Sequence, residues 1–139
     1  MAYAELDYAE ITADVACTAT TEAAADTIIT LPARTYDGST AIIVEFFCPA
    51  WRQSTTTVVA FLPLFQDGSV YGRMWDSRGW VANDELAGFV SRVRITPAPG
   101  SRTYSIRGHV GSASTFTVRA GAGGAGTLMP AYLRTIQVG

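Results

Sequence analysis

The sequence predicts an all-β protein with about eight strands, arranged as a sandwich or a barrel. Short segments rich in Val, Ile, Thr and aromatic residues recur along the chain, and several alternate apolar with polar side chains. Turn-forming pairs such as Asp67-Gly68 and Gly111-Ser112 separate them at intervals of roughly ten residues. This spacing is typical of antiparallel sheets and differs from the strand-helix-strand pattern of a parallel sheet.

The first four expected strands have apolar or β-branched compositions. Segment 27–31 reads Thr-Ile-Ile-Thr-Leu, and segment 41–48 holds the longest apolar run of the chain, which Glu45 interrupts. Segment 55–61 passes from three threonines into Val-Val-Ala-Phe, and segment 70–75 carries a Tyr and a Trp. These compositions favour strands.

The last four expected strands include the two with the plainest alternation. Segment 89–95 contains Val-Ser-Arg-Val-Arg-Ile, and segment 114–119 ends in Phe-Thr-Val-Arg, so both suit a sheet with one solvated face. Segment 102–107 follows the turn Pro97-Ala-Pro-Gly100, and segment 132–138 closes the chain after a glycine-rich turn.

Two connections differ from simple turns. Residues 20–26 favour a helix by propensity, with Thr20 as a candidate N-cap, but they lack an apolar stripe, so we expect a connection with at most one helical turn. Residues 76–87 are expected to form the longest irregular stretch. Long loops in compact domains are often functional, although a loop that covers the open end of a sandwich is as common.

The low charge content excludes some partners. Charged residues make up 16% of the chain, the formal net charge is −2, and all ten basic residues are arginines, which GC-rich codon usage explains most simply. Because no Lys/Arg run can neutralise a line of phosphates, we expect no nucleic-acid partner. A small domain with so few charged residues has too few polar groups to cover its surface. We therefore expect an obligate oligomer that buries part of this surface between subunits.

Signals for secretion and membrane insertion are not found. The first residues lack the charged and apolar regions of a signal peptide, and no apolar run approaches the length of a membrane span. Cys17 and Cys48 form neither a CxxC pair nor a larger cysteine framework. We therefore expect a soluble protein without a membrane partner, synthesised in the cytoplasm and not secreted. The cysteines are expected to be buried free thiols, with a disulfide bridge as the alternative.

The glycine run near the end fits a cofactor motif only formally. Gly121-Ala-Gly-Gly-Ala-Gly126 matches G-x-G-x-x-G, but Pro130 follows closely and the chain ends at Gly139. Neither a helix nor a ribose-binding acid can follow, and no Lys stands where a phosphate-binding loop has one. We expect a turn with close strand approach, and no cofactor.

Catalytic and metal sites are not predicted either. His109 is the only histidine, no G-x-S-x-G motif occurs, and one histidine with two distant cysteines cannot form an ordinary zinc site. A glycosidase or a calcium site would need carboxylates, but we expect the acidic residues to be solvated. The acids considered are Glu5, Asp7, Glu10, Asp76, Asp84 and Glu85. We expect no catalytic, cofactor-binding or metal-binding residues and no enzymatic activity.

Aromatic residues are numerous for a chain of this size. Such residues populate cores, sugar-binding faces and protein interfaces alike, and we expect most of them in the core or at a subunit interface. The set considered is Tyr36, Trp51, Phe65, Tyr71, Trp75 and Trp80.

The order of motifs resembles that of small virion structural proteins of actinobacteriophages. The resemblance is carried by Thr20-Thr-Glu-Ala-Ala-Ala25, Tyr36-Asp-Gly-Ser-Thr40, Val44-Glu-Phe-Phe47 and Met129-Pro-Ala-Tyr-Leu-Arg134. In that family, jelly-roll modules similar in architecture to tumour necrosis factor and C1q domains assemble as homotrimers.

The resemblance implies a single jelly-roll domain over 1–139, with eight strands in two sheets. One sheet would pack against its copies around a threefold axis, and segment 132–138 is the candidate for that buried sheet. Residues 1–19 are expected as an N-terminal arm that contacts the virion or a neighbouring subunit.

The resemblance also implies a non-enzymatic function on the virion. We expect a capsid decoration protein that binds the major capsid protein or another virion protein and stabilises the coat lattice, because no coiled-coil heptads or Gly-X-Y run could form a fibre shaft. One alternative is a tail-fibre or baseplate module that recognises host surface glycan through Trp75 and Trp80. A glycan-cleaving enzyme that uses Asp76 or Asp84 is the third hypothesis.

Overall fold

The computed structural model describes residues 3–79, 81–123 and 126–138, and its elements are β-strands. No helix in these ranges is long and apolar enough to cross a membrane. The strands are β1 Tyr3–Ile11, β2 Val15–Cys17, β3 Asp26–Thr30, β4 Arg34–Tyr36, β5 Ile42–Gln53, β6 Val59–Gln66, β7 Ser69–Arg78, β8 Leu86–Ile95, β9 Gly100–Arg102, β10 Tyr104–Val110, β11 Phe116–Arg119, β12 Ala122–Gly123, β13 Gly126–Thr127 and β14 Ala131–Val138.

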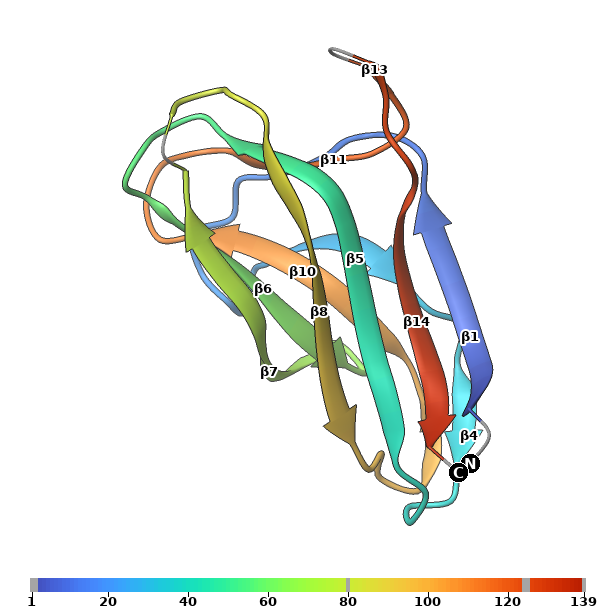
Figure 1. The fold of residues 1–139 in the computed structure, drawn as a ribbon. Helices are drawn as coiled ribbons and strands as arrows, with labels where there is room; N and C mark the ends of the chain where they lie inside the picture. Colours follow the sequence, from blue (N-terminus) through green and yellow to red (C-terminus); the bar gives the residue numbers. More distant parts are fainter. Residues whose placement is uncertain (1–2, 80, 124–125, 139) are drawn as a thin grey trace.

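Two antiparallel sheets form the sandwich (Figure 1). In the first sheet, β5 pairs with β8 along one side and with β14 and β11 along the other. β14 then pairs with β1, and β11 pairs with β2. The second sheet has the order β3-β10-β6-β7. β4 and β9 form a small ribbon, as do β12 and β13.

The fold is the expected jelly roll, and the strand order shows it. β1 with β2, and β11 with β14, each act as one interrupted strand, which leaves eight strands in chain order. The first sheet then has the order 1-8-3-6 and the second 2-7-4-5. Two four-stranded sheets connected in this way are the double Greek key of the jelly-roll fold.

The core lies between the two sheets and follows the alternation of the strands. Val44 and Phe46 of β5 are fully buried, in one hydrophobic cluster with Leu62 of β6, Ile106 of β10 and Leu133 of β14. Burial of one such side chain stabilises the fold by about 1.5–3 kcal/mol. Because successive side chains of a strand point to opposite faces, the residues between these core positions lie on the outer face of the first sheet.

Within residues 1–19, the expected N-terminal arm, strands β1 and β2 pair with the first sheet. β1 pairs with β14 from Tyr3 opposite Val138 to Ile11 opposite Ala131. The composition of β1 does not predict a strand, because Ala, Glu and Asp are poor strand formers. The pairing with β14 overrides that local preference. A contact of this edge with a virion or a neighbouring copy stays a prediction.

The strand expected at 55–61 lies further along the chain, at Val59–Gln66. Residues 54–57 form a turn instead, in which Thr57 has a φ of 69°. The strand continues through Pro63 because its pairing with β7 shifts register at that proline and again after Leu64. Bulges of this kind let a residue without a backbone N–H remain in a sheet.

The long irregular stretch expected at 76–87 is shorter in the structure. β7 extends to Arg78 and β8 begins at Leu86, so the loop covers 79–85, and Trp80 lies outside the described residues. Residues 20–26 form a connection without a helix and lead into β3. The Asp26 carboxylate holds this connection, because it accepts hydrogen bonds from the backbone N–H groups of Thr18 and Ala19 at 2.8 and 3.0 Å.

The two cysteines are buried free thiols, as expected. Burial raises the pKa of Cys17 to about 12, with the Asp26 carboxylate adding to the effect. Burial likewise raises the pKa of Cys48 to about 12. Both side chains therefore remain protonated and act as small apolar core residues.

Candidate functional site

The outer face of the first sheet carries the most organised set of solvent-side residues. Antiparallel register places residues from β1, β14, β5 and β8 in three rows across the sheet. From β1 to β8, the first row is Glu10, Tyr132, Phe47 and Val90, the second is Tyr8, Arg134, Glu45 and Arg92, and the third is Glu5, Ile136, Ile43 and Arg94. These twelve residues, with Tyr3 at the edge, are called the outer face below.

Aromatic rings run across one part of the outer face. The ring of Tyr132 lies 5.4 Å from that of Tyr8 on β1 and 5.4 Å from that of Phe47 on β5. On β8 the row continues with Val90, which is 53% exposed. Tyr8 and Val90 are exposed, and Tyr132 and Phe47 are half-buried. A row of solvent-accessible aromatic and apolar side chains is typical of a protein interface.

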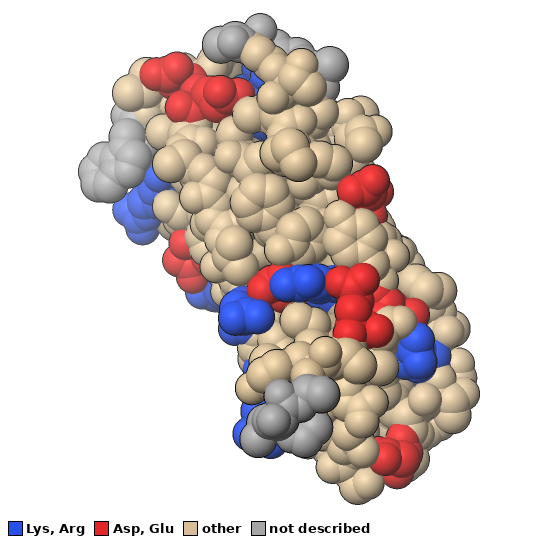
Figure 2. All heavy atoms as spheres, turned by 45° about the vertical axis from the view of Figure 1, so that its right-hand side comes forward, with Lys and Arg blue, Asp and Glu red and all other residues tan. Residues whose placement is uncertain are grey.

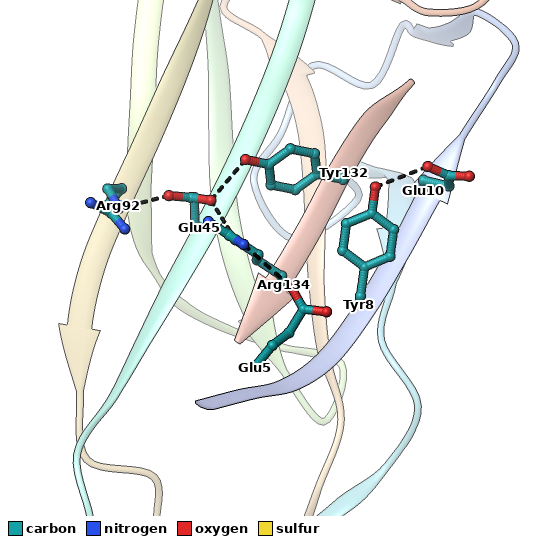
Figure 3. Close-up of polar contacts among 7 residues, drawn as sticks. All are labelled: Glu5, Tyr8, Glu10, Glu45, Arg92, Tyr132 and Arg134. Carbon is teal, nitrogen blue, oxygen red and sulfur yellow. Dashed lines mark hydrogen bonds and ion pairs between the residues drawn. The ribbon is translucent and has the colours of Figure 1, made fainter. Parts of the chain in front are cut away.

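A buried carboxylate lies beside this aromatic row. The Glu45 side chain is only 5% exposed, although it lies on the outer side of the sheet. Its Oε2 accepts hydrogen bonds from Arg134 Nε at 2.6 Å and from Tyr132 OH at 2.8 Å. Its Oε1 lies 2.7 Å from Arg92 Nε. Arg134 also reaches Glu5 at 3.3 Å, so the network joins β1, β14, β5 and β8 (Figure 3).

The arginines and the tyrosine keep Glu45 ionised. Burial acts to raise the pKa of Glu45, but the hydrogen bonds from Arg134 and Tyr132 and the nearby charge of Arg92 outweigh it and hold the pKa below its usual range. Burial, reinforced by a hydrogen bond to Glu10, raises the pKa of Tyr8 to about 12. The phenol of Tyr8 therefore remains a hydrogen-bond donor, and its OH donates to Glu10 Oε2 at 2.9 Å.

The charged part of the outer face is also hollowed. A depression of about 480 Å³ is lined by Tyr3, Glu5, Ile43, Arg92, Arg134 and Ile136. Figure 2 shows acidic and basic side chains gathered in a band across this side of the molecule, next to a broad surface without charges. The lining of the depression therefore combines two isoleucines and a tyrosine with three charged side chains.

The acidic residues considered from the sequence are dispersed over the fold. Asp7 is paired with Arg34, whose Nε lies 2.6 Å from Asp7 Oδ2. Asp76 on β7 lies 3.1 Å from Arg73. Asp84 and Glu85 are in the 79–85 loop, where Glu85 lies 3.7 Å from the Arg119 guanidinium. Glu5 and Glu10 are on the outer face.

His109 lies on the second sheet, away from the outer face. Its ring stacks on Phe61 at 4.7 Å, and burial lowers its pKa below the ordinary value. The Arg73 guanidinium covers the same Phe61 ring at 4.5 Å. His109 therefore packs as part of an aromatic and arginine stack.

Several of the aromatic residues considered form a cluster near the 79–85 loop. Trp75 stacks on Phe89 at 4.1 Å with nearly parallel rings, and its ring lies 5.2 Å from that of Trp51. Phe116 packs against both tryptophans. One face of Trp75 is thus already covered by Phe89, which joins the edges of the two sheets. Tyr36 and Tyr71 both lie edge-on to the Tyr104 ring.

The Glu45 network was not among the sites predicted from the sequence. A signal for it exists, because Glu45 interrupts the longest apolar run and falls between Ile43 and Phe47 at the spacing of one strand face. That spacing locates the carboxylate on a face but does not identify Arg92 and Arg134 as its partners.

Comparisons with known proteins found no matching family model and no matching curated protein. Among solved structures, the chain is similar to the EclA C-terminal domain, a sugar-binding protein, with 12% identity and a TM-score of 0.43 over 78% of this chain and 76% of that one. It is also similar to a structure of infectious bursal disease virus, Gt strain, with 18% identity and a TM-score of 0.33. That match covers 94% of this chain, which spans 37% of the viral one.

Proposed function

We propose that this chain is a non-enzymatic structural protein of a bacteriophage virion, a decoration protein that binds the coat lattice as a homotrimer and stabilises it. The observation that carries the proposal is the outer face of the first sheet. It combines an aromatic row, a depression and a buried charge network on a surface that no other part of the chain covers among the described residues.

Self-association is the simplest use of this face. Tyr, Phe and Arg are enriched at interfaces, and the outer face contains all three. Its three carboxylates, Glu5, Glu10 and Glu45, balance its three arginines, Arg92, Arg94 and Arg134, so the face as a whole is neutral. Burying charges that are already paired costs less than burying isolated ones.

The place on the virion comes from the resemblance to actinobacteriophage proteins. A compact trimer suits the threefold positions of a capsid lattice, where one trimer bridges several coat subunits. With the first sheets buried against one another, the second sheet and the loops would remain free to bind the major capsid protein or another virion protein.

The proposal is tested on phage heads that lack this protein. We expect such heads to rupture at a lower temperature and under a milder osmotic shock than complete heads. Adding the purified protein should restore the stability of complete heads. The physical reason is that a trimer bridging coat subunits resists the outward pressure of packaged DNA. Equal stability with and without the protein would contradict the role in reinforcement.

A depression at the loop end of the sandwich favours the alternative, a tail-fibre or baseplate module that binds host glycan. It measures about 570 Å³ and is lined by Thr56, Thr57, Ser77, Arg78 and Gly79. Hydroxyl and guanidinium groups suit the hydrogen-bonding of sugars. The alternative would be supported over decoration by three results. The trimer would bind intact host cells, Arg78→Ala would abolish that binding, and the trimer would not bind capsids.

A further inference from the structure

We propose that copies of this chain associate around an axis parallel to the strands of the first sheet, with Arg94 of one copy facing Glu5 of the next. The inference rests on the proposed self-association and goes further, because it names the direction of the axis and a pair of residues that hold the copies together.

The two edge strands of the outer face carry opposite charge. On the outer face, β1 carries Glu5 and Glu10 and no basic residue. β8 contains Arg92 and Arg94 and no acidic residue. Between them, Glu45 and Arg134 neutralise each other on the central strands. A charge difference therefore runs across the face, from an acidic edge to a basic edge.

The edge charges are only partly satisfied within one chain. Arg94 is exposed and makes no ion pair with any residue in the described ranges. Glu5 is also exposed, and its contact with Arg134 is 3.3 Å, while the Arg134 Nε lies closer, at 2.6 Å, to Glu45. Arg94 and Glu5 thus remain available for partners outside the chain.

The symmetry of the association decides which charges meet. A rotation about an axis keeps every residue at its height along that axis. When the axis is parallel to the strands, the β8 edge of one copy approaches the β1 edge of the next, and residues of one row meet at the same height. Arg94 and Glu5 both belong to the third row, so they face each other.

The competing arrangement brings like charges together. A twofold axis perpendicular to the sheet would place β1 against β1, with acid facing acid, or β8 against β8, with arginine facing arginine. Like charges at close range across an interface oppose association. The charge pattern therefore favours a head-to-tail arrangement that closes around an axis along the strands.

A charge exchange tests the inference by the mass of the full-length protein in solution, measured by light scattering and sedimentation. We expect Arg94→Glu and Glu5→Arg each to weaken the association at least tenfold at low salt. The double variant, which restores opposite charges, should associate within about threefold of the original protein. Arg78→Glu is the matched control, because Arg78 is an exposed arginine on the edge strand β7 of the second sheet.

The outcomes separate this inference from the proposed function. Suppose that the original protein forms the trimer. If neither single exchange weakens the trimer, or if the double variant associates no more tightly than the single variants, the pairing of Arg94 with Glu5 is wrong while self-association stands. If the original protein is monomeric, both are wrong. Thermal unfolding of every variant shows whether a loss of association is a loss of folding, and a variant that unfolds is replaced by the milder Arg94→Gln or Glu5→Gln.

Discussion

Glu45 shows how a single residue links the outer face to the stability of the fold. Its carboxylate is buried on the solvent side of a sheet and is held by Arg134, Arg92 and Tyr132. Such a group is stabilising only while it is ionised, because the protonated form accepts these hydrogen bonds poorly and leaves the arginines without their counter-charge.

The first prediction concerns the pH dependence of this contribution. Since the folded-state pKa of Glu45 is lowered, its stabilisation is present above the unfolded pKa of about 4.3 and is lost as the pH falls through the folded value. We expect Glu45→Gln to lower the free energy of unfolding by about 2 kcal/mol at neutral pH, with a gap to the original protein that narrows below about pH 4.

Urea unfolding at several pH values measures this gap. Glu10→Gln is the matched control, since Glu10 is an exposed carboxylate on the same face, held by the Tyr8 hydroxyl, and should change stability by less than about 0.5 kcal/mol. A gap of constant size from neutral to acidic pH would show that the ionised carboxylate is not the cause.

Among the elements, the junction of β11 and β12 depends on one glycine. Gly121 has a φ of 71°, and a Cβ there would collide with the backbone carbonyl of Thr12 in the bend between β1 and β2. The same junction is tied to that bend by Asp14, which accepts a hydrogen bond from the Ala120 N–H at 3.1 Å and pairs with Arg119 at 3.3 Å. The backbone between β11 and β12 therefore passes close to the backbone between β1 and β2, and only a glycine at position 121 leaves room for this approach.

We predict that Gly121→Ala lowers the free energy of unfolding by at least about 2 kcal/mol, because the substitution strains the backbone and pushes against Thr12. Gly126→Ala in the same glycine run has no atom within 4 Å of the new Cβ and should change stability little. Thermal or urea unfolding of the two variants makes the comparison. Similar losses for both would mean that the whole run, and not the approach to Thr12, limits substitution.

For the whole molecule, the two sheets differ in their expected surroundings. In the proposed trimer, the outer face of the first sheet is buried between copies and the second sheet remains in contact with solvent. Each sheet has an exposed valine on an edge strand, Val90 on β8 at 53% exposure and Val70 on β7 at 40%. This pair allows the two faces to be compared with the same substitution.

We predict that Val90→Arg reduces the solution mass toward that of a single 14.8 kDa chain, whereas Val70→Arg leaves it unchanged. In Val90→Arg, the new guanidinium lies beside Phe47 in the aromatic row and would lose its water without gaining a partner when copies associate. In Val70→Arg, the guanidinium lies on a free face and remains in water. Light scattering after size exclusion measures the mass. Dissociation by Val70→Arg in place of Val90→Arg would assign the interface to the second sheet.

The sequence by itself determined the all-β class and most of the strand positions, because alternation and turn residues are local signals. The buried positions Val44 and Phe46 and the turn at Asp67-Gly68 can be predicted from their neighbours in the chain. The strand at β1 and the shift of β6 could not, because pairing with β14 and the bulge at Pro63 override local composition.

Only the tertiary structure decided which side chains share the outer face. Glu45 meets Arg134 across 89 positions of sequence, and the meeting depends on the register of β5 with β14. A slip of one residue would turn the Arg134 side chain to the opposite face of the sheet, and nothing near either residue in the chain specifies the register. The acidic and basic edges likewise arise from the jelly-roll order, which places β1 and β8 at opposite sides of one sheet.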